Sequence, residues 1–65
     1  MDFQYIDKKR EEKRFSVTEF CELVGIDRTT YYKYLKDPGT MKISTWVKMA
    51  NILKLTEAER RASLR

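Results

Sequence analysis

The stretch that decides the fold is SVTEFCELVGIDRTTYYKYLK, which covers residues 16–36. Ser16 followed by Glu19 has the spacing of a capping box, in which each residue bonds the backbone N–H of the other at a helix N-terminus. The apolar residues that follow have the spacing of one helix face: Val17, Phe20, Cys21 and Val24. Gly25 comes directly after the last of them, where a helix commonly ends. We therefore predict a helix of about eight residues that ends at Val24.

A second helix is predicted to begin only about three residues later. Asp27 is a candidate N-cap, and the Asp-Pro-Gly run at 37–39 ends the pattern, so the expected span is Arg28 to Lys36. So short a connection forces the two helices to cross at a steep angle, which is the geometry of a helix-turn-helix unit. One face of the second helix should then protrude, and it carries no acidic residue. Its members are Arg28, Thr29, Tyr32, Lys33 and Lys36.

The rest of the chain predicts further short helices and no strands. A first helix is expected over residues 3–13, and a last one after Thr56, which is a good N-cap. Between them, Ser44 is a candidate cap for a helix over residues 45–53. This helix should be largely buried, with Trp46 as an anchor, because its apolar surface is wide. The members of that surface are Ile43, Trp46, Val47, Met49, Ala50, Ile52 and Leu53.

Length and composition favour one small globular domain over residues 1–65. Hydrophobic residues make up 42% of the chain and charged residues 37%, a mixture that suits a compact fold rather than disorder. We expect an all-α, compact bundle of four to five short helices in the cytoplasm, because neither a secretory signal nor a membrane span is visible in the sequence. There is no histidine and one cysteine, Cys21, which is expected to be a small buried side chain. We therefore expect no enzyme, no cofactor and no metal site.

Positive charge is concentrated in the middle of the chain. The formal net charge is +4, and residues 28–54 hold six basic side chains against Asp37 alone. A localised basic surface attracts polyanions, because neutralising phosphates releases condensed counterions. Charge alone leaves two interpretations open, a nucleic-acid surface and an ordinary solvated lysine surface.

The motif resembles the lambda-repressor-like family of Cro, CI and XRE-type helix-turn-helix domains. The family pattern, Ser-x-x-Glu-Leu-Ala-x-x-x-Gly-Val-Ser-x-x-Thr-Ile-x-x-Ile, aligns without gaps from Ser16 to Tyr34. The likeness extends from about Tyr5 to Glu59. It implies a phage- or plasmid-type transcriptional regulator that binds an operator in double-stranded DNA and represses by blocking polymerase. It also implies a homodimer, which is expected to be weak or to form on DNA and to use the region from about Leu53 to Leu64.

The resemblance assigns contacts to the protruding face and to the residues that flank it. It implies contacts to bases by Arg28, Thr29, Tyr32 and Lys33. It implies contacts to phosphates by Arg10, Ser16, Lys36, Thr40 and Lys42. Each has an ordinary alternative: Ser16 and Thr29 as helix caps, Tyr32 as a cover for the edge of the core, and the cations as solvated surface groups.

Several residues depart from the family pattern. Arg14 stands where the family often has a glycine in a left-handed turn. Leu35 stands where an acidic residue often pairs with the arginine that matches Arg10, so that pair is missing here. Tyr31 and Tyr34 replace smaller aliphatic residues, and we expect both rings in the core.

A second hypothesis is a protein-interaction module, such as an antirepressor or an antitoxin. The cluster that would form its contact surface consists of Tyr31, Tyr32, Tyr34 and Leu35. Salt separates the two hypotheses, because DNA binding weakens steeply as salt rises and an apolar contact does not.

Overall fold

The computed structural model describes residues 1–64, and in them the prediction of an all-α fold is confirmed. Five α-helices and one short 3-10 helix are present, and no strand occurs in this range. In chain order they are α1 (Phe3–Glu12), α2 (Val17–Val24), α3 (Arg28–Lys36), η1 (Pro38–Thr40), α4 (Ile43–Ile52) and α5 (Glu57–Ser63). None of the helices described is long and apolar enough to cross a bilayer.

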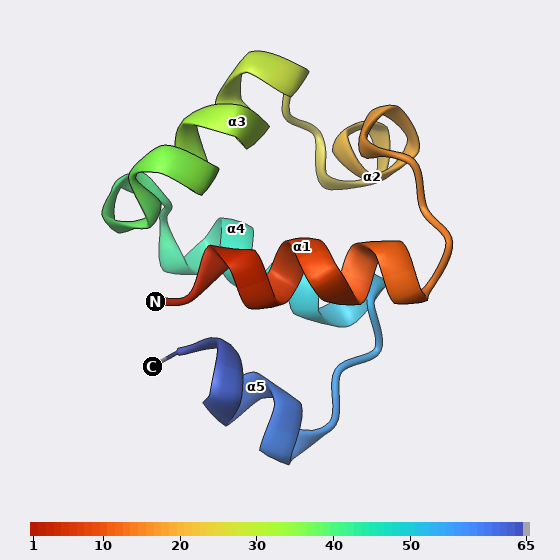
Figure 1. Cartoon of the computed structure of the whole chain (residues 1–65), viewed down its shortest axis with the longest axis vertical. Helices are drawn as coiled ribbons and strands as arrows, with labels where there is room; N and C mark the ends of the chain where they lie inside the picture. The colour runs from red at the N-terminus through yellow and green to blue at the C-terminus, as the bar shows by residue number, and fades with distance from the viewer. Residues whose placement is uncertain (65) are drawn as a thin grey trace.

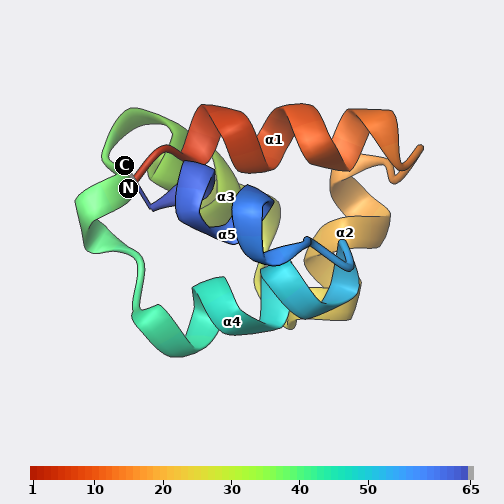
Figure 2. The same cartoon turned by 90° about the horizontal axis from the view of Figure 1, so that it is seen from below.

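The helices surround one core. In Figure 1, α1 crosses the middle of the molecule, with α2 and α3 on one side of it and α5 on the other. Figure 2 shows α4 on the side of the molecule opposite α1. Cys21 is buried, as predicted. The largest fully buried side chains come from all five helices and from the residue after α4: Phe3, Ile6, Phe20, Tyr31, Met49, Leu53 and Ser63.

The predicted helix-turn-helix boundaries are confirmed at both ends of the turn. The Ser16 hydroxyl accepts a bond from the Glu19 amide at 3.0 Å, and the Glu19 carboxylate accepts one from the Ser16 amide at 3.3 Å. Gly25 ends α2 in the left-handed conformation, with φ of 87°. The Asp27 carboxylate accepts a bond from the Thr30 amide at 2.7 Å and so caps α3. The turn between the helices is therefore three residues long, as the sequence predicted.

The turn after α1 keeps the left-handed conformation although it lacks glycine. Arg14 has φ of 64°, and Lys54 adopts the same conformation after α4, with φ of 52°. At both places the next residue donates its amide to a carbonyl in the last helical turn: Phe15 to Arg10 at 3.1 Å and Leu55 to Ala50 at 3.0 Å. The departure at Arg14 thus changes the residue and leaves the backbone geometry unchanged.

The predicted start and burial of α4 are wrong in two respects. The amides of Thr45 and Trp46 both donate to the Lys42 carbonyl, so the helix begins at Ile43 and Ser44 lies inside it instead of capping it. Ile43 and Val47 lie one turn apart and are 62% and 39% exposed, so the buried surface is narrower than predicted. Trp46 is the expected anchor and donates its indole N–H to the Ser63 hydroxyl at 2.9 Å.

Helix α5 closes the structure against α1. The Lys9 ammonium lies 2.8 Å from a carboxylate oxygen of Glu59, and Glu59 itself belongs to a second capping box with Thr56. The Asp2 amide donates to the Ser63 carbonyl at 2.8 Å, which joins the two ends of the described chain. Figure 1 shows the ends side by side.

Candidate nucleic-acid interface

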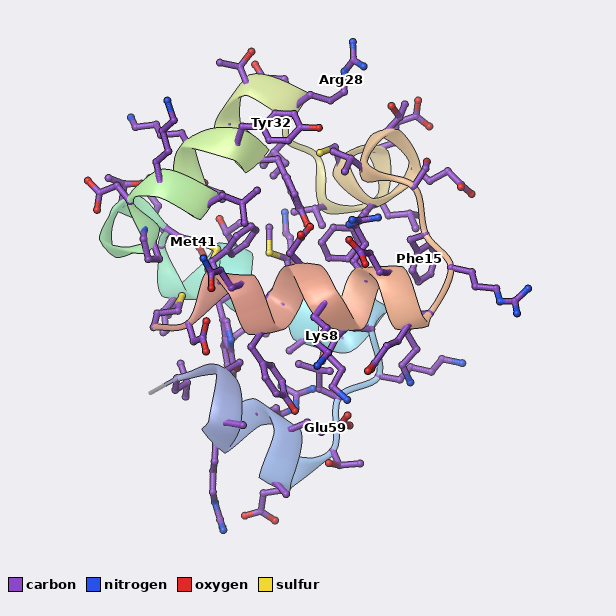
Figure 3. All side chains as sticks on the ribbon, in the orientation of Figure 1. Lys8, Phe15, Arg28, Tyr32, Met41 and Glu59 are labelled. Atoms are coloured by element: carbon purple, nitrogen blue, oxygen red, sulfur yellow. The ribbon has the colours of Figure 1, made fainter. Side chains whose placement is uncertain are left out.

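Helix α3 has one buried face and one exposed face, as predicted. Tyr31 is fully buried and Tyr34 is 8% exposed, so both rings belong to the core. The five residues predicted to protrude are all exposed: Arg28, Thr29, Tyr32, Lys33 and Lys36. Figure 3 shows Arg28 at the start of α3 extending away from the body of the molecule, with Tyr32 one turn further along the helix. We call these five residues the α3 face.

The polar groups of the α3 face are not used inside the protein. Among residues 1–64, no hydrogen bond or ion pair involves the side chains of the five residues. Arg28 alone offers five N–H donors, and each lysine offers three. Tyr32 makes an edge-on contact with Tyr31, with ring centroids 5.9 Å apart, and its outer half faces solvent. The face therefore presents donors and one aromatic ring to a partner.

One acidic group near this face was not foreseen. An open hollow beside the helix is lined by Thr29, Tyr32, Lys33, Lys36 and Asp37. The sequence offered one signal, since Asp37 follows Lys36 directly. Because Asp37 lies after the end of α3, it was not expected to lie beside the α3 face. Its carboxylate repels a phosphate and weakens the positive potential at the Lys36 end of the α3 face.

The N-terminus of α3 is already occupied by a carboxylate. The Thr30 amide donates to the Asp27 carboxylate at 2.7 Å. The Thr30 side chain, followed by this amide, holds the pKa of the Asp27 carboxyl below its ordinary value. Asp27 is thus ionised at neutral pH, and its negative charge interacts favourably with the positive end of the helix dipole. The Thr30 amide is therefore not available to a phosphate.

The flanking residues divide into available and occupied donors. Lys42 is exposed and makes no hydrogen bond or ion pair through its side chain within residues 1–64. The Ser16 hydroxyl accepts the capping bond and keeps its own hydrogen as a donor. Thr40 differs, because its hydroxyl donates to the Asp37 carbonyl at 2.8 Å. A phosphate contact by Thr40 would require this bond to break.

Arg10 has a different place from the one the sequence predicted. Its side chain is 10% exposed, and it donates to Asp7 at 3.1 Å, to the Tyr31 hydroxyl at 3.2 Å and to the Phe15 carbonyl at 2.5 Å. The structure does not support a phosphate contact by Arg10, because these internal bonds hold its guanidinium. Two signals were available: Asp7 lies three residues earlier on the same helix, and a buried tyrosine hydroxyl needs a partner.

The cluster proposed for protein interaction does not form a continuous exposed surface. Tyr31 and Tyr34 are in the core and Leu35 is half-buried, which leaves Tyr32 as the exposed member. The large exposed apolar residues lie elsewhere, at Leu23, Ile43, Val47 and Leu64. Two of the four residues on which the second hypothesis rested, Tyr31 and Tyr34, are thus unavailable to a partner protein.

A short helix, a three-residue turn and a second helix with an exposed cationic face define a helix-turn-helix DNA-binding domain. The comparison with protein families agrees, since a helix-turn-helix family model matches residues 6–60. The chain belongs to this family of XRE, Cro and CI-type helix-turn-helix domains. No curated protein and no solved structure gives a significant match to the chain.

Proposed function

We propose that this protein is a phage- or plasmid-type repressor of the Cro kind, which occupies an operator with the first turns of α3 in the major groove. One observation carries the proposal: the side chains of the α3 face are exposed and form no polar contact inside the described protein. A recognition helix needs such donors, because base edges in the major groove are read by hydrogen bonds and apolar contacts. Occupation of the operator would exclude polymerase.

The base contacts are assigned to the first four residues of the α3 face. Arg28 donates two parallel bonds to O6 and N7 of guanine, an arrangement worth roughly 1–3 kcal/mol in discrimination between bases. Thr29 and Lys33 contact the neighbouring bases. Tyr32 packs on a sugar or on a thymine methyl group.

The proposed contacts to the DNA backbone lie around the base-contacting residues of the α3 face. Lys36 and Lys42 are exposed cations that neutralise phosphates, and the Ser16 hydroxyl donates to a phosphate at the N-terminus of α2. Arg10 and Thr40 are omitted from the proposed interface because their donors are engaged inside the protein.

Two copies are proposed to bind one operator. Half-sites about one helical turn apart, about 34–36 Å, match the symmetry of such a dimer. The proposed contact lies in the region from Leu53 to Leu64, and the partly exposed Leu64 supports it. A contact this small favours association on DNA.

The first test is selection of bound duplexes from a random pool at low salt with the wild type and Arg28→Ala. We expect the wild type to enrich a short half-site, and the variant to lose its preference at one or two base pairs because the guanine contact is gone. Lys8→Ala is the matched control, since it removes an exposed cation from α1. It should leave the half-site unchanged. Failure of the wild type to enrich any motif would contradict the proposal.

A further inference from the structure

A buried network joins α1 to α3 and to the turn before α2. We call Asp7, Arg10 and Tyr31 the hydroxyl network. The Tyr31 hydroxyl donates to the Asp7 carboxylate and accepts a bond from the Arg10 Nε at 3.2 Å. The same Arg10 nitrogen lies 3.1 Å from Asp7, while the Arg10 Nη1 donates to the Phe15 carbonyl at 2.5 Å. One guanidinium therefore bonds two elements that are far apart in the sequence.

The network is well suited to fixing orientation. Tyr31 is fully buried, and Arg10 as a residue is 8% exposed. Hydrogen bonds to charged groups are short and directional, and they are stronger where water is scarce. The guanidinium is planar, so its nitrogens hold their partners at fixed relative positions.

The hydroxyl network reaches both elements that carry the proposed DNA contacts, at Phe15 before α2 and at Tyr31 on α3. Phe15, whose carbonyl is bonded, directly precedes Ser16 at the N-terminus of α2. Tyr31 lies about 160° around the helix from Thr29 and Lys33, at 3.6 residues per turn. The network thus holds α3 on the side away from Thr29 and Lys33.

We propose that Tyr31 is a positioning residue whose hydroxyl sets the rotation of α3 relative to the N-terminus of α2. This inference rests on the proposed function, because it concerns the register in which base and phosphate contacts are made together. The ring of Tyr31 also packs edge-on against Phe3 and Phe20, with centroids 5.0 and 6.1 Å away. Packing holds the ring in the core, and the hydroxyl adds directional hydrogen bonds to Asp7 and Arg10.

The test compares Tyr31→Phe with Tyr34→Phe. Tyr34 lies on the same helix and is also buried, but its hydroxyl has no hydrogen-bond partner among residues 1–64. Affinity for the selected operator and for an unrelated duplex is measured far below the melting temperature, where circular dichroism shows both variants folded. We expect Tyr31→Phe to bind the operator about fivefold more weakly, and the unrelated duplex within about twofold of the wild type. Tyr34→Phe should leave both affinities unchanged.

The ratio of the two affinities is the decisive readout, because a purely structural role would lower the melting temperature and leave the ratio unchanged. A second pair of variants keeps the test independent of Tyr31. Asp7→Ala removes the acceptor and should lower the ratio, whereas Asp7→Asn keeps an acceptor oxygen and should retain it. An unchanged ratio in Tyr31→Phe and Asp7→Ala would overturn the positioning role alone. Absence of duplex binding by the wild type would overturn the proposed function together with this inference.

Discussion

Positions 25 and 14 need the same backbone conformation, although one holds a glycine and the other an arginine. Both adopt the left-handed backbone conformation, with φ of 87° and 64°. A Cβ atom added at Gly25 would have no neighbour within 4 Å, so a substitution there meets backbone strain and no steric clash. Arg14 already bears that strain, which costs roughly 1–2 kcal/mol for an L-residue.

The two sites should therefore respond in opposite directions. Gly25→Ala is expected to lower the free energy of unfolding by about 1 kcal/mol, and Arg14→Gly to raise it by up to about 1 kcal/mol. For a domain of this size, 1 kcal/mol corresponds to a shift of roughly 4–8 °C in Tm. Urea denaturation and thermal melts measure both changes. A Gly25→Ala protein as stable as the wild type would show that the turn does not need its left-handed conformation.

At the scale of elements, local sequence chemistry predicted the central helices well. Helices α2 and α3 have strong signals at both ends: Ser16 with Glu19, then Gly25, then Asp27. These signals act within one turn of helix, so they can be identified from the sequence without knowledge of the fold. The exposed face of α3 followed from the same spacing. Contact between that face and the bases of DNA stays a prediction.

What was missed depends on contacts between elements. Helix α4 begins without a side-chain cap, so nothing local separated Ile43 from the better capping residue Ser44. The exposure of Ile43 and Val47 depends on which neighbours cover α4, and periodicity does not contain this information. The role of Arg10 likewise depends on Tyr31, which lies 21 residues away in the chain.

At the scale of the whole molecule, an ion pair holds the last helix in place. Glu59 accepts from Lys9 on α1 and from the Thr56 amide at 2.9 Å. The Lys9 ammonium, followed by the Thr56 amide, lowers the pKa of Glu59 from 4.5 to about 2. Because the pKa is lower in the folded state, this group stabilises the fold above pH 4.5, and the contribution is lost as the pH falls towards 2.

Stability should therefore decline in acid less steeply in Glu59→Gln than in the wild type. The fluorescence of Trp46 reports on the packing of α5. Its indole N–H bonds the Ser63 hydroxyl, and its ring centroid lies 5.8 Å from the Arg60 guanidinium carbon. Urea titrations followed by its fluorescence, at about pH 6 and about pH 3, measure the difference. Glu57→Gln is the matched control, since Glu57 pairs with Arg61 inside α5 and should keep the wild-type acid sensitivity. Identical acid profiles for wild type and Glu59→Gln would contradict this account.

The exposed face of α3 is proposed to contact the DNA. The most direct measurement is a titration of the ¹⁵N-labelled protein with the selected operator duplex, followed by amide chemical shifts. We expect the largest changes in Arg28 to Lys33 and at the N-terminus of α2, with α5 contributing little beyond the dimer contact near Leu64. Changes centred on Ile43 and Val47, with α3 undisturbed, would contradict the claim.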